Sequence, residues 1–320
     1  MTTAATGADR ADFVWHGHPI RSALALDLPR AASGAPLAPL TIAVDGELAD
    51  PPARPLWRSA YTGFELHADR TGCWLARPDL RIRIQPDAIV LSATPDAIAL
   101  EYLRTRVLAL WLHLIAAPPI HASAVARDGV ALAFLGASGA GKSTLCAAMR
   151  AHGCTPLADD LLPLAAGVEG VPVYPGHGGL HLWPDSARHL LGDIAQLPRI
   201  PAQGEKRRLA APAQTRAARL RAVLLLRRGP VAAAACVRLS GAEALLTLLA
   251  HGQMAGCAER LGLGGMRLQR LGAALAHFPV YAFEYPDKLA DLPAACALAA
   301  SLLRSDCDAV SDDRIKGSRA

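Results

Sequence analysis

Residues 130–144 read VALAFLGASGAGKST, and this stretch decides the fold class of the chain. The apolar run at 130–135 predicts a buried strand, and the pattern G-x-x-x-x-G-K-[ST] follows it from Gly136 to Ser143. Residues 143–152 can form a helix that ends at Gly153 as its C-cap. A strand, a glycine-rich loop and a helix in this order predict an α/β fold with a phosphate-binding loop, or P-loop.

Each residue type in the loop suits a phosphate ligand. The glycines let backbone N–H groups turn towards phosphate oxygens, and the helix that follows adds the positive end of its dipole. Lys142 would place a positive charge on the β- and γ-phosphates, and the hydroxyl of Ser143 would coordinate Mg²⁺. We therefore expect ATP and Mg²⁺ to bind at Gly136, Ala137, Ser138, Gly139, Ala140, Gly141, Lys142, Ser143 and Thr144.

A predicted β-hairpin precedes the loop. Asp128-Gly129 between two apolar runs is a strong signal for a two-residue turn, and it makes the numbers of paired residues sum to 257. This register sets His121 opposite Gly136, and a change of one residue in the turn would shift it. A lone histidine is more often structural than catalytic. If the register holds, His121 would orient a neighbouring carboxylate or contact phosphate.

Two adjacent acids follow the predicted loop helix. Asp159 lies 17 residues beyond Lys142, which is enough for one helix and a returning strand. The end of that strand would bring Asp159 and Asp160 to the edge where the loop lies. Phosphoryl transfer needs a carboxylate near Mg²⁺ and a group that accepts the proton of the attacking hydroxyl, and two acids can divide this work. The alternative is a turn at the strand end that an aspartate caps.

Residues 1–104 predict a small β-rich N-terminal domain. Residues 41–44, 64–67 and 80–84 are expected to be strands, with 88–91 as the hairpin partner of 80–84. Thr94-Pro95-Asp96 predicts a helix with Thr94 as N-cap, ending near residue 117. Residues 105–304 would form the catalytic domain, with later helices at 242–261 and 288–303, and residues 305–320 a polar, flexible tail.

Composition narrows the class of protein. The chain has 52% hydrophobic and 19% charged residues and a net charge of +5, which is typical of a folded globular protein. The longest apolar run, 107–120, is too short for a membrane span, and the N-terminus lacks a signal sequence, so we expect a cytoplasmic protein without a membrane partner. Residues 199–228 hold nine basic residues and one acid but no aromatic residue, which favours a solvated face over a nucleic-acid site.

Other P-loop classes fit the sequence less well. GTP-binding switches need a D-x-x-G element and an N/T-K-x-D motif after the loop, and the residues that follow Thr144 contain neither. An ABC-type ATPase is a stronger rival, because residues 239–243, LSGAE, resemble the signature of that family. That class also requires an apolar strand ending in Asp-Glu soon afterwards, and residues 245–265 contain no such strand.

The order His121-Ala-Ser, hairpin, G-x-S-G-x-G-K-S, helix and Ala158-Asp159-Asp160 resembles the catalytic domain of the HPr kinase/phosphorylase family. The closest likeness is to its HPr-kinase-like branch, which includes serine kinases of lasso-peptide maturation. Looser likeness is found in residues 174–175 (YP), 180–185 (LHLWPD), 206–207 (KR) and 280–286 (VYAFEYP), so the resemblance covers about 105–303.

The resemblance implies roles for individual residues. Asp159 would be the general base, Asp160 would lie with Ser143 near Mg²⁺, and His121 would orient the pair. Lys206 and Arg207 would help to neutralise phosphate charge, and the chain could form a homo-oligomer, as this family often does. The bacterial HPr kinases continue their loop with Gly-Lys-Ser-Glu, whereas Thr144 stands here after Ser143. Their acidic signature stretch is not recognisable at 176–185, so a peptide is a more natural substrate than HPr.

Three functional hypotheses follow. The first is a Mg-ATP-dependent serine kinase that phosphorylates a peptide or small protein, such as a lasso-peptide precursor. The second is a P-loop ATPase or nucleotide switch without an acceptor substrate. The third is a small-molecule kinase. Transfer of phosphate to a hydroxyl supports the first or third, and release only to water supports the second.

Overall fold

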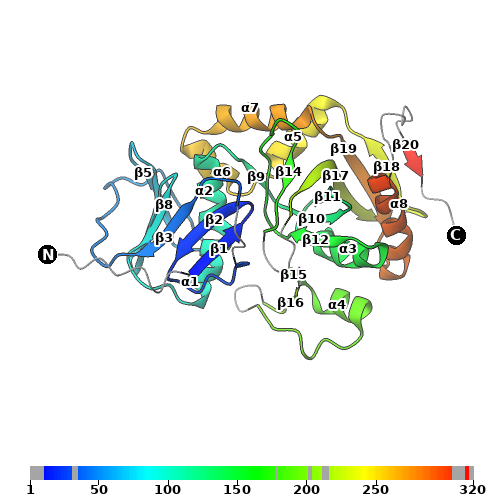
Figure 1. Ribbon diagram of the computed structural model, residues 1–320, viewed down its shortest axis with the longest axis horizontal. Helices are drawn as coiled ribbons and strands as arrows, with labels where there is room; N and C mark the ends of the chain where they lie inside the picture. Colours follow the sequence, from blue (N-terminus) through cyan, green and yellow to red (C-terminus); the bar gives the residue numbers. More distant parts are fainter. Residues whose placement is uncertain are drawn as a thin grey trace.

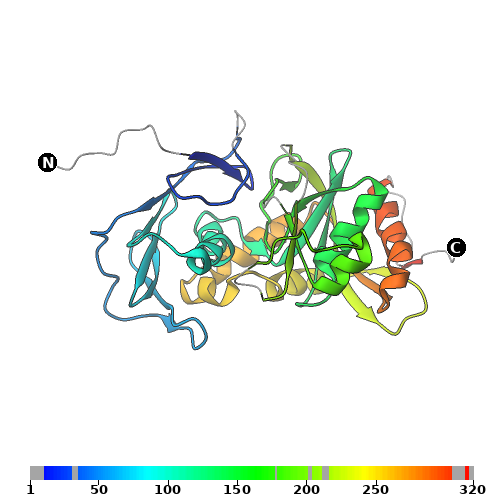
Figure 2. The same ribbon diagram turned by 90° about the horizontal axis from the view of Figure 1, so that it is seen from below.

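The computed structural model describes residues 11–30, 35–176, 179–200, 204–210, 216–304 and 314–316. It is a mixed α/β structure with two large sheets, one from the first hundred residues and one from residues after 120 (Figure 1). Seen from below, the helices that follow the first sheet lie between it and the second (Figure 2). None of the helices in these parts of the chain combines the length and apolar character that crossing a bilayer requires.

The first sheet has the strand order β1-β2-β3-β8-β7-β6-β5-β4 within the described residues. Its strands are β1 (Ala11–Trp15), β2 (His18–Ser22), β3 (Leu40–Val44), β4 (Trp57–Arg58), β5 (Glu65–Ala68), β6 (Cys73–Arg77), β7 (Leu80–Ile84) and β8 (Ala88–Leu91). The strands predicted at 41–44, 64–67, 80–84 and 88–91 are found within one residue, and β7 and β8 pair antiparallel as predicted. The alternation of Leu80, Ile82 and Ile84 faces the core, as the pattern indicated.

A continuous helical stretch packs against this sheet. It consists of α1 (Ala97–Tyr102), a π-helical segment (Leu103–Val107) and α2 (Leu108–Leu114). Its N-cap is Asp96 rather than the predicted Thr94, because the Asp96 carboxylate accepts a 2.7 Å hydrogen bond from the Ala99 N–H. The boundary predicted between 104 and 105 falls inside this helical stretch, whose buried residues share a hydrophobic cluster with the first sheet.

The second sheet has the order β12-β10-β11-β17-β19-β18-β20, with β14 also paired to β17. Its strands are β10 (Ala122–Arg127), β11 (Val130–Leu135), β12 (Thr155–Ala158), β14 (Pro172–Val173), β17 (Ala218–Gly229), β18 (Ala235–Arg238), β19 (Val280–Pro286) and β20 (Arg314–Lys316). The predicted hairpin is confirmed, because Ala122 pairs with Leu135 and Arg127 with Val130. Asp128 and Gly129 both have positive φ, at 52° and 77°, as the tight hairpin turn requires.

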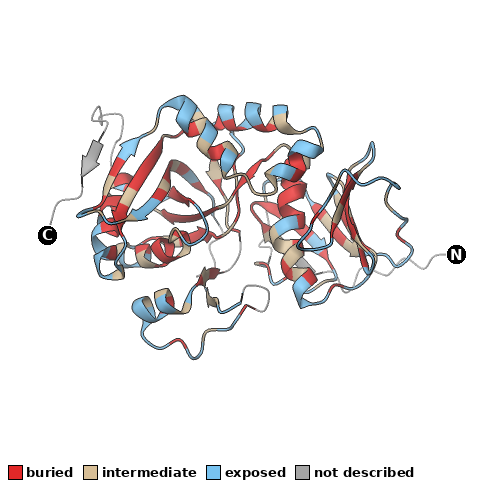
Figure 3. Ribbon diagram, turned by 180° about the vertical axis from the view of Figure 1, so that it is seen from behind, coloured by how far each residue is buried: buried red, intermediate tan, exposed pale blue. Residues whose placement is uncertain are grey.

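Helices cover both faces of the second sheet. On one face lie α3 (Lys142–Ala148), the 3₁₀ turn Met149–His152 and α8 (Leu292–Arg304), and on the other α5 (Gly241–Ala250) and α7 (Gly264–Leu275). The helix predicted at 242–261 is two helices, α5 and α6 (Ala255–Arg260), and α7 was not predicted. The helix predicted at 288–303 starts as a 3₁₀ turn, Leu289–Asp291. Burial is concentrated in the strands and in the helix faces that pack on them (Figure 3).

A small arm extends from the second sheet (Figure 1). It contains the antiparallel pair β15 (Gly179–Leu182) and β16 (Arg207–Ala210) and the helix α4 (Pro184–Leu191). A second short pair, β9 (Pro119–Ile120) with β13 (Leu162–Pro163), lies where the two halves meet. Most of the tail predicted to be flexible, 305–320, lies outside the described residues, and its segment Arg314–Lys316 forms β20 on β18.

Candidate functional site

The glycine-rich loop joins β11 to α3. Gly136, Gly139 and Gly141 have φ values of 150°, 83° and 91°, which residues with a Cβ rarely adopt. At Gly141 the space is also closed, because a Cβ would lie 2.2 Å from the hydroxyl oxygen of Tyr285. That hydroxyl donates a 2.6 Å hydrogen bond to the carbonyl oxygen of Ala140. Tyr285, on β19, therefore fixes the path of the loop.

Lys142 turns its ammonium group back into the loop. The Nζ atom donates hydrogen bonds to the carbonyl oxygens of Gly136, at 2.9 Å, and Ala137, at 3.1 Å. The residue is only 6% exposed, and burial lowers its pKa although the two neighbouring aspartates act to raise it. A cation held inside a ring of backbone groups is a suitable partner for an anion that enters the loop.

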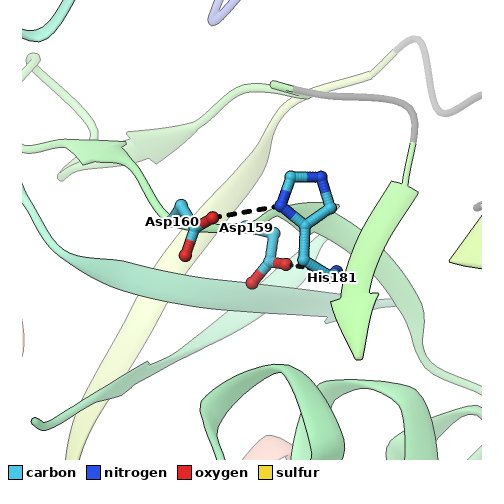
Figure 4. A group of neighbouring side chains, drawn as sticks. All are labelled: Asp159, Asp160 and His181. Carbon is cyan, nitrogen blue, oxygen red and sulfur yellow. Dashed lines mark hydrogen bonds and ion pairs between the residues drawn. The ribbon is translucent and has the colours of Figure 1, made fainter. Parts of the chain in front are cut away.

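Asp159 follows β12 and is 2% exposed. One oxygen, Oδ1, accepts hydrogen bonds from the hydroxyls of Ser123, at 2.5 Å, and Ser143, at 2.8 Å. The other, Oδ2, accepts a 2.8 Å bond from the backbone N–H of His181 (Figure 4). Asp159 thus connects β10, α3 and β15, and its carboxylate lies directly beside the hydroxyl of the loop residue Ser143.

Asp160 is oriented differently from its neighbour. Its φ of 65° is uncommon for a residue with a side chain. Oδ2 of Asp160 accepts a hydrogen bond from Nδ1–H of His181 at 3.2 Å (Figure 4), and its carbonyl oxygen accepts one from Nδ1–H of His121 at 2.9 Å. The contact of His121 is therefore with the backbone of the pair and not with a carboxylate.

The two carboxyl groups titrate in opposite directions. Burial raises the pKa of Asp159, and the negative charge of Asp160 raises it further. Burial also acts to raise the pKa of Asp160, but the hydrogen bond and charge of His181, with Lys206 and His121, hold it below its ordinary value. Asp160 is therefore the more firmly ionised member of the pair.

The two histidines also differ. Burial acts to lower the pKa of His181, but the hydrogen bond to Asp160 and the charges of both aspartates raise it above its ordinary value. Burial, with the charge of Lys142, lowers the pKa of His121. His181 consequently carries positive charge more readily than His121, and it pairs with the ionised Asp160.

A cavity of about 700 Å³ opens beside these residues. One wall is formed by the loop and the start of α3, and Asp160, His181 and His121 lie along it. The lining also includes Glu101 and Tyr102 of α1 and Thr105 of the π-helical segment. A π-helical segment is frequent at functional sites. The cavity is therefore lined both by the loop and by the helix that packs on the first sheet.

The predicted site residues are partly brought together. Cavity-lining residues among them are Ser138, Gly139, Gly141, Lys142, Ser143, Thr144, His121, Asp160 and Lys206. Gly136, Ala137 and Ala140 shape the loop, and Asp159 lies behind the lining, where Ser143 covers it. Lys206 lies 5.7 Å from the ring of Trp183, whereas the guanidinium of Arg207 donates to the carbonyl oxygen of Leu197 and does not line the cavity.

His181, Ser123 and Tyr285 belong to the site but were not selected from the sequence. Asp159, Asp160 and His181 form a cluster whose ligand atoms all lie within 4.8 Å of one another, a geometry that could hold a metal ion. His181 lies in the run LHLW, where the alternation of a polar residue with buried leucines was the available signal. Ser123 and Tyr285 were also missed, because their contacts depend on pairings across the sheet.

Two comparisons with known proteins found no relative of this chain. No protein-family model matches the chain, and no curated protein matches it either. The arrangement of the site residues therefore carries the functional argument.

Proposed function

We propose that this protein is a Mg-ATP-dependent serine kinase, which transfers the γ-phosphoryl group of ATP to a hydroxyl of a peptide or small protein. We further propose that residues 136–144 form a P-loop and that the protein belongs to the HPr-kinase-like branch, which its sequence resembles. A lasso-peptide precursor is the substrate that this resemblance implies.

The observation that carries the proposal is the contact between Ser143 and Asp159. A hydroxyl at the start of the loop helix and a carboxylate at the end of a strand, 2.8 Å apart, are the pair that holds Mg²⁺ in P-loop enzymes. Both donors are oxygens, which Mg²⁺ prefers. When bound, Mg²⁺ would neutralise charge on the transferred phosphate. We therefore assign the cation to Ser143 and Asp159.

Asp160 is the better candidate for the proton acceptor. It lines the cavity, it is the more firmly ionised member of the pair, and His181 fixes its carboxylate. The attacking hydroxyl oxygen would form a bond to the γ-phosphorus while the bond to the bridging oxygen of ADP breaks, and the hydroxyl proton would pass to Asp160. This division of roles is the reverse of the one that the family resemblance implies for the two aspartates.

Lys142 and the loop amides would bind the phosphates. Phosphate oxygens can replace the carbonyl oxygens of Gly136 and Ala137 as partners of the Lys142 ammonium. This exchange keeps a buried cation paired before and after binding.

The test is transfer of labelled γ-phosphate from Mg-ATP to a serine-containing peptide substrate, with release to water measured in parallel. We expect Lys142→Ala to weaken nucleotide binding roughly ten- to hundredfold, because it removes a charged hydrogen-bond donor, and to abolish turnover. Lys288→Ala, a change of lysine outside the cavity lining, is the matched control and should behave as the wild type. Phosphate release to water alone, with peptide and small-molecule hydroxyl acceptors present, would contradict the kinase proposal and support an ATPase or switch.

A further inference from the structure

The turn between α5 and α6, residues 251–254, faces the same cavity from a different part of the chain. Its sequence is HGQM, and it interrupts a stretch that the sequence predicts as one helix. Gln253 is the residue of this turn that lines the cavity, together with Lys142, His121 and Asp160. None of the phosphate-binding or catalytic assignments above uses it.

Backbone contacts fix the turn on both sides of Gln253. The His121 N–H donates to the carbonyl oxygen of His251, and the Gln253 N–H donates to that of Pro119, both at 2.9 Å. The Gln253 carbonyl oxygen accepts a 2.8 Å bond from Nε2–H of His113, a buried residue of α2. The turn is therefore joined to the strand segment that delivers His121 to the site.

A buried arginine supports the turn from beneath. Arg267, on α7, is 2% exposed and donates to the carbonyl oxygen of Leu249, where α5 ends, at 3.2 Å. Its guanidinium lies so close to Gly252 that a Cβ there would be 2.5 Å from Nη2. Met254 has a φ of 55°, so the chain bends sharply just after Gln253. These contacts fix the backbone of the turn, so the Cα of Gln253 is held at the edge of the cavity.

The Gln253 side chain, unlike its backbone, is not held by hydrogen bonds within the described residues. Its amide makes no hydrogen bond to any of the described residues, although its backbone makes two. The amide offers two N–H donors and one acceptor oxygen, and it is neutral at every pH. The adjacent His251 lies within electrostatic reach of Lys142 and His121, so the turn borders the phosphate end of the cavity.

We propose that the amide of Gln253 donates a hydrogen bond to an oxygen of the terminal phosphate of a nucleoside triphosphate bound at Lys142. This inference rests on the proposed nucleotide site and adds a residue that distinguishes a triphosphate from a diphosphate. A diphosphate ends one phosphate earlier, so the Gln253 amide has no partner in it. Because the backbone of the turn is already fixed, binding would have to order only the Gln253 side chain and not the turn itself.

The experiment compares the binding of two probes, Mg²⁺ with ADP and Mg²⁺ with a non-hydrolysable ATP analogue, by calorimetry. In Gln253→Ala we expect the affinity for the ATP analogue to fall at least about tenfold, as for loss of a hydrogen bond to a charged group, with the affinity for ADP unchanged. Gln269→Ala, on the exposed face of α7, is the matched control and should leave both affinities unchanged. Gln253→Glu, which places a negative charge near the phosphate, should weaken the analogue more than Gln253→Ala does.

Each other result overturns the inference. Equal loss for both nucleotides would mean that Gln253 supports the site as a whole, and loss for neither would mean that it does not contact the phosphate. A Gln253→Ala variant whose turnover falls while both affinities stay unchanged would place the amide on the acceptor. Failure of the proposed function is a separate outcome, because the wild-type protein would then bind neither nucleotide or would bind both without transferring phosphate.

Discussion

Asp159 and Asp160 are adjacent in the sequence and have different surroundings. Asp159 is enclosed by two serine hydroxyls and a backbone N–H, whereas Asp160 faces the cavity and pairs with His181. Asp160 also has a positive φ, of 65°, which is uncommon for a residue with a side chain. One strand end thus supplies a buried carboxylate beside Ser143 and a more firmly ionised carboxylate at the cavity.

Changing each aspartate to asparagine should therefore affect a different property of the protein, turnover for Asp160 and Mg²⁺-dependent binding of ATP for Asp159. We expect Asp160→Asn to keep Mg-ATP affinity and lower turnover roughly 10²- to 10⁴-fold, because it removes the proposed proton acceptor. Asp159→Asn should weaken binding of ATP in the presence of Mg²⁺ but not in its absence, because it removes the proposed cation ligand. Calorimetry with and without Mg²⁺, and single-turnover kinetics, measure the two effects. The opposite pattern would support the assignment that follows from the family resemblance.

The arm of β15, β16 and α4 positions part of the site. β15 carries His181, and His181 pairs across the strands with Arg208 of β16. Asp27, in the segment after β2, forms ion pairs with Arg208 and with Arg104 of the π-helical segment, and Arg104 pairs with Glu101 at 2.6 Å. These charges connect the arm to the helical stretch that also lines the cavity.

Removing the central charge of this network should loosen the arm. We expect Asp27→Asn to increase hydrogen exchange at 179–182 and 207–210 about three- to fivefold, the size expected for partly exposed ion pairs. Asp50→Asn removes a carboxylate that pairs with Arg81 in a more exposed position, and it serves as the control. Exchange that rises equally in both variants would show that the network does not hold the arm. High salt should reproduce part of the effect in the wild type.

The elements that the sequence predicted are those set by local rules. The hairpin at Asp128-Gly129, the strand before the loop and the C-cap at Gly153 depend on neighbouring residues alone, and all three are present. The contact of Asp159 with the loop followed from counting residues through one helix and one strand. His181 and Gln253 reach the site through pairings with distant segments, and no local pattern encodes such pairings.

At the scale of the whole molecule, the site is built where two hydrophobic clusters meet. Leu161, the residue directly after the aspartate pair, packs in the cluster of the first sheet, as does Cys257 from α6. His113 of α2 is buried there and donates to the turn that carries Gln253. The first sheet therefore contributes to the shape of the site as well as to the packing of the helices.

His113 should make this junction sensitive to acid. Burial lowers its pKa to about 4, whereas in the unfolded chain its pKa is about 6.5. Between these values the unfolded state binds more protons, so stability falls as the pH decreases from about 6.5 to about 4, by roughly 3 kcal/mol at most. His113→Gln keeps a donor for the Gln253 carbonyl but cannot titrate. Denaturant unfolding across this range should show a smaller decline for His113→Gln, and equal declines would contradict the prediction.

Strand β20 affects whether copies of this protein can associate through the edge of the second sheet. It pairs with β18, which would otherwise be the last strand on that side of the second sheet. An unpaired outer strand offers a row of free backbone groups on which another chain can add a strand of its own. Residues 314–316 occupy that row from within the same molecule, so a chain shortened before Arg314 would expose a template for self-association far from the cavity.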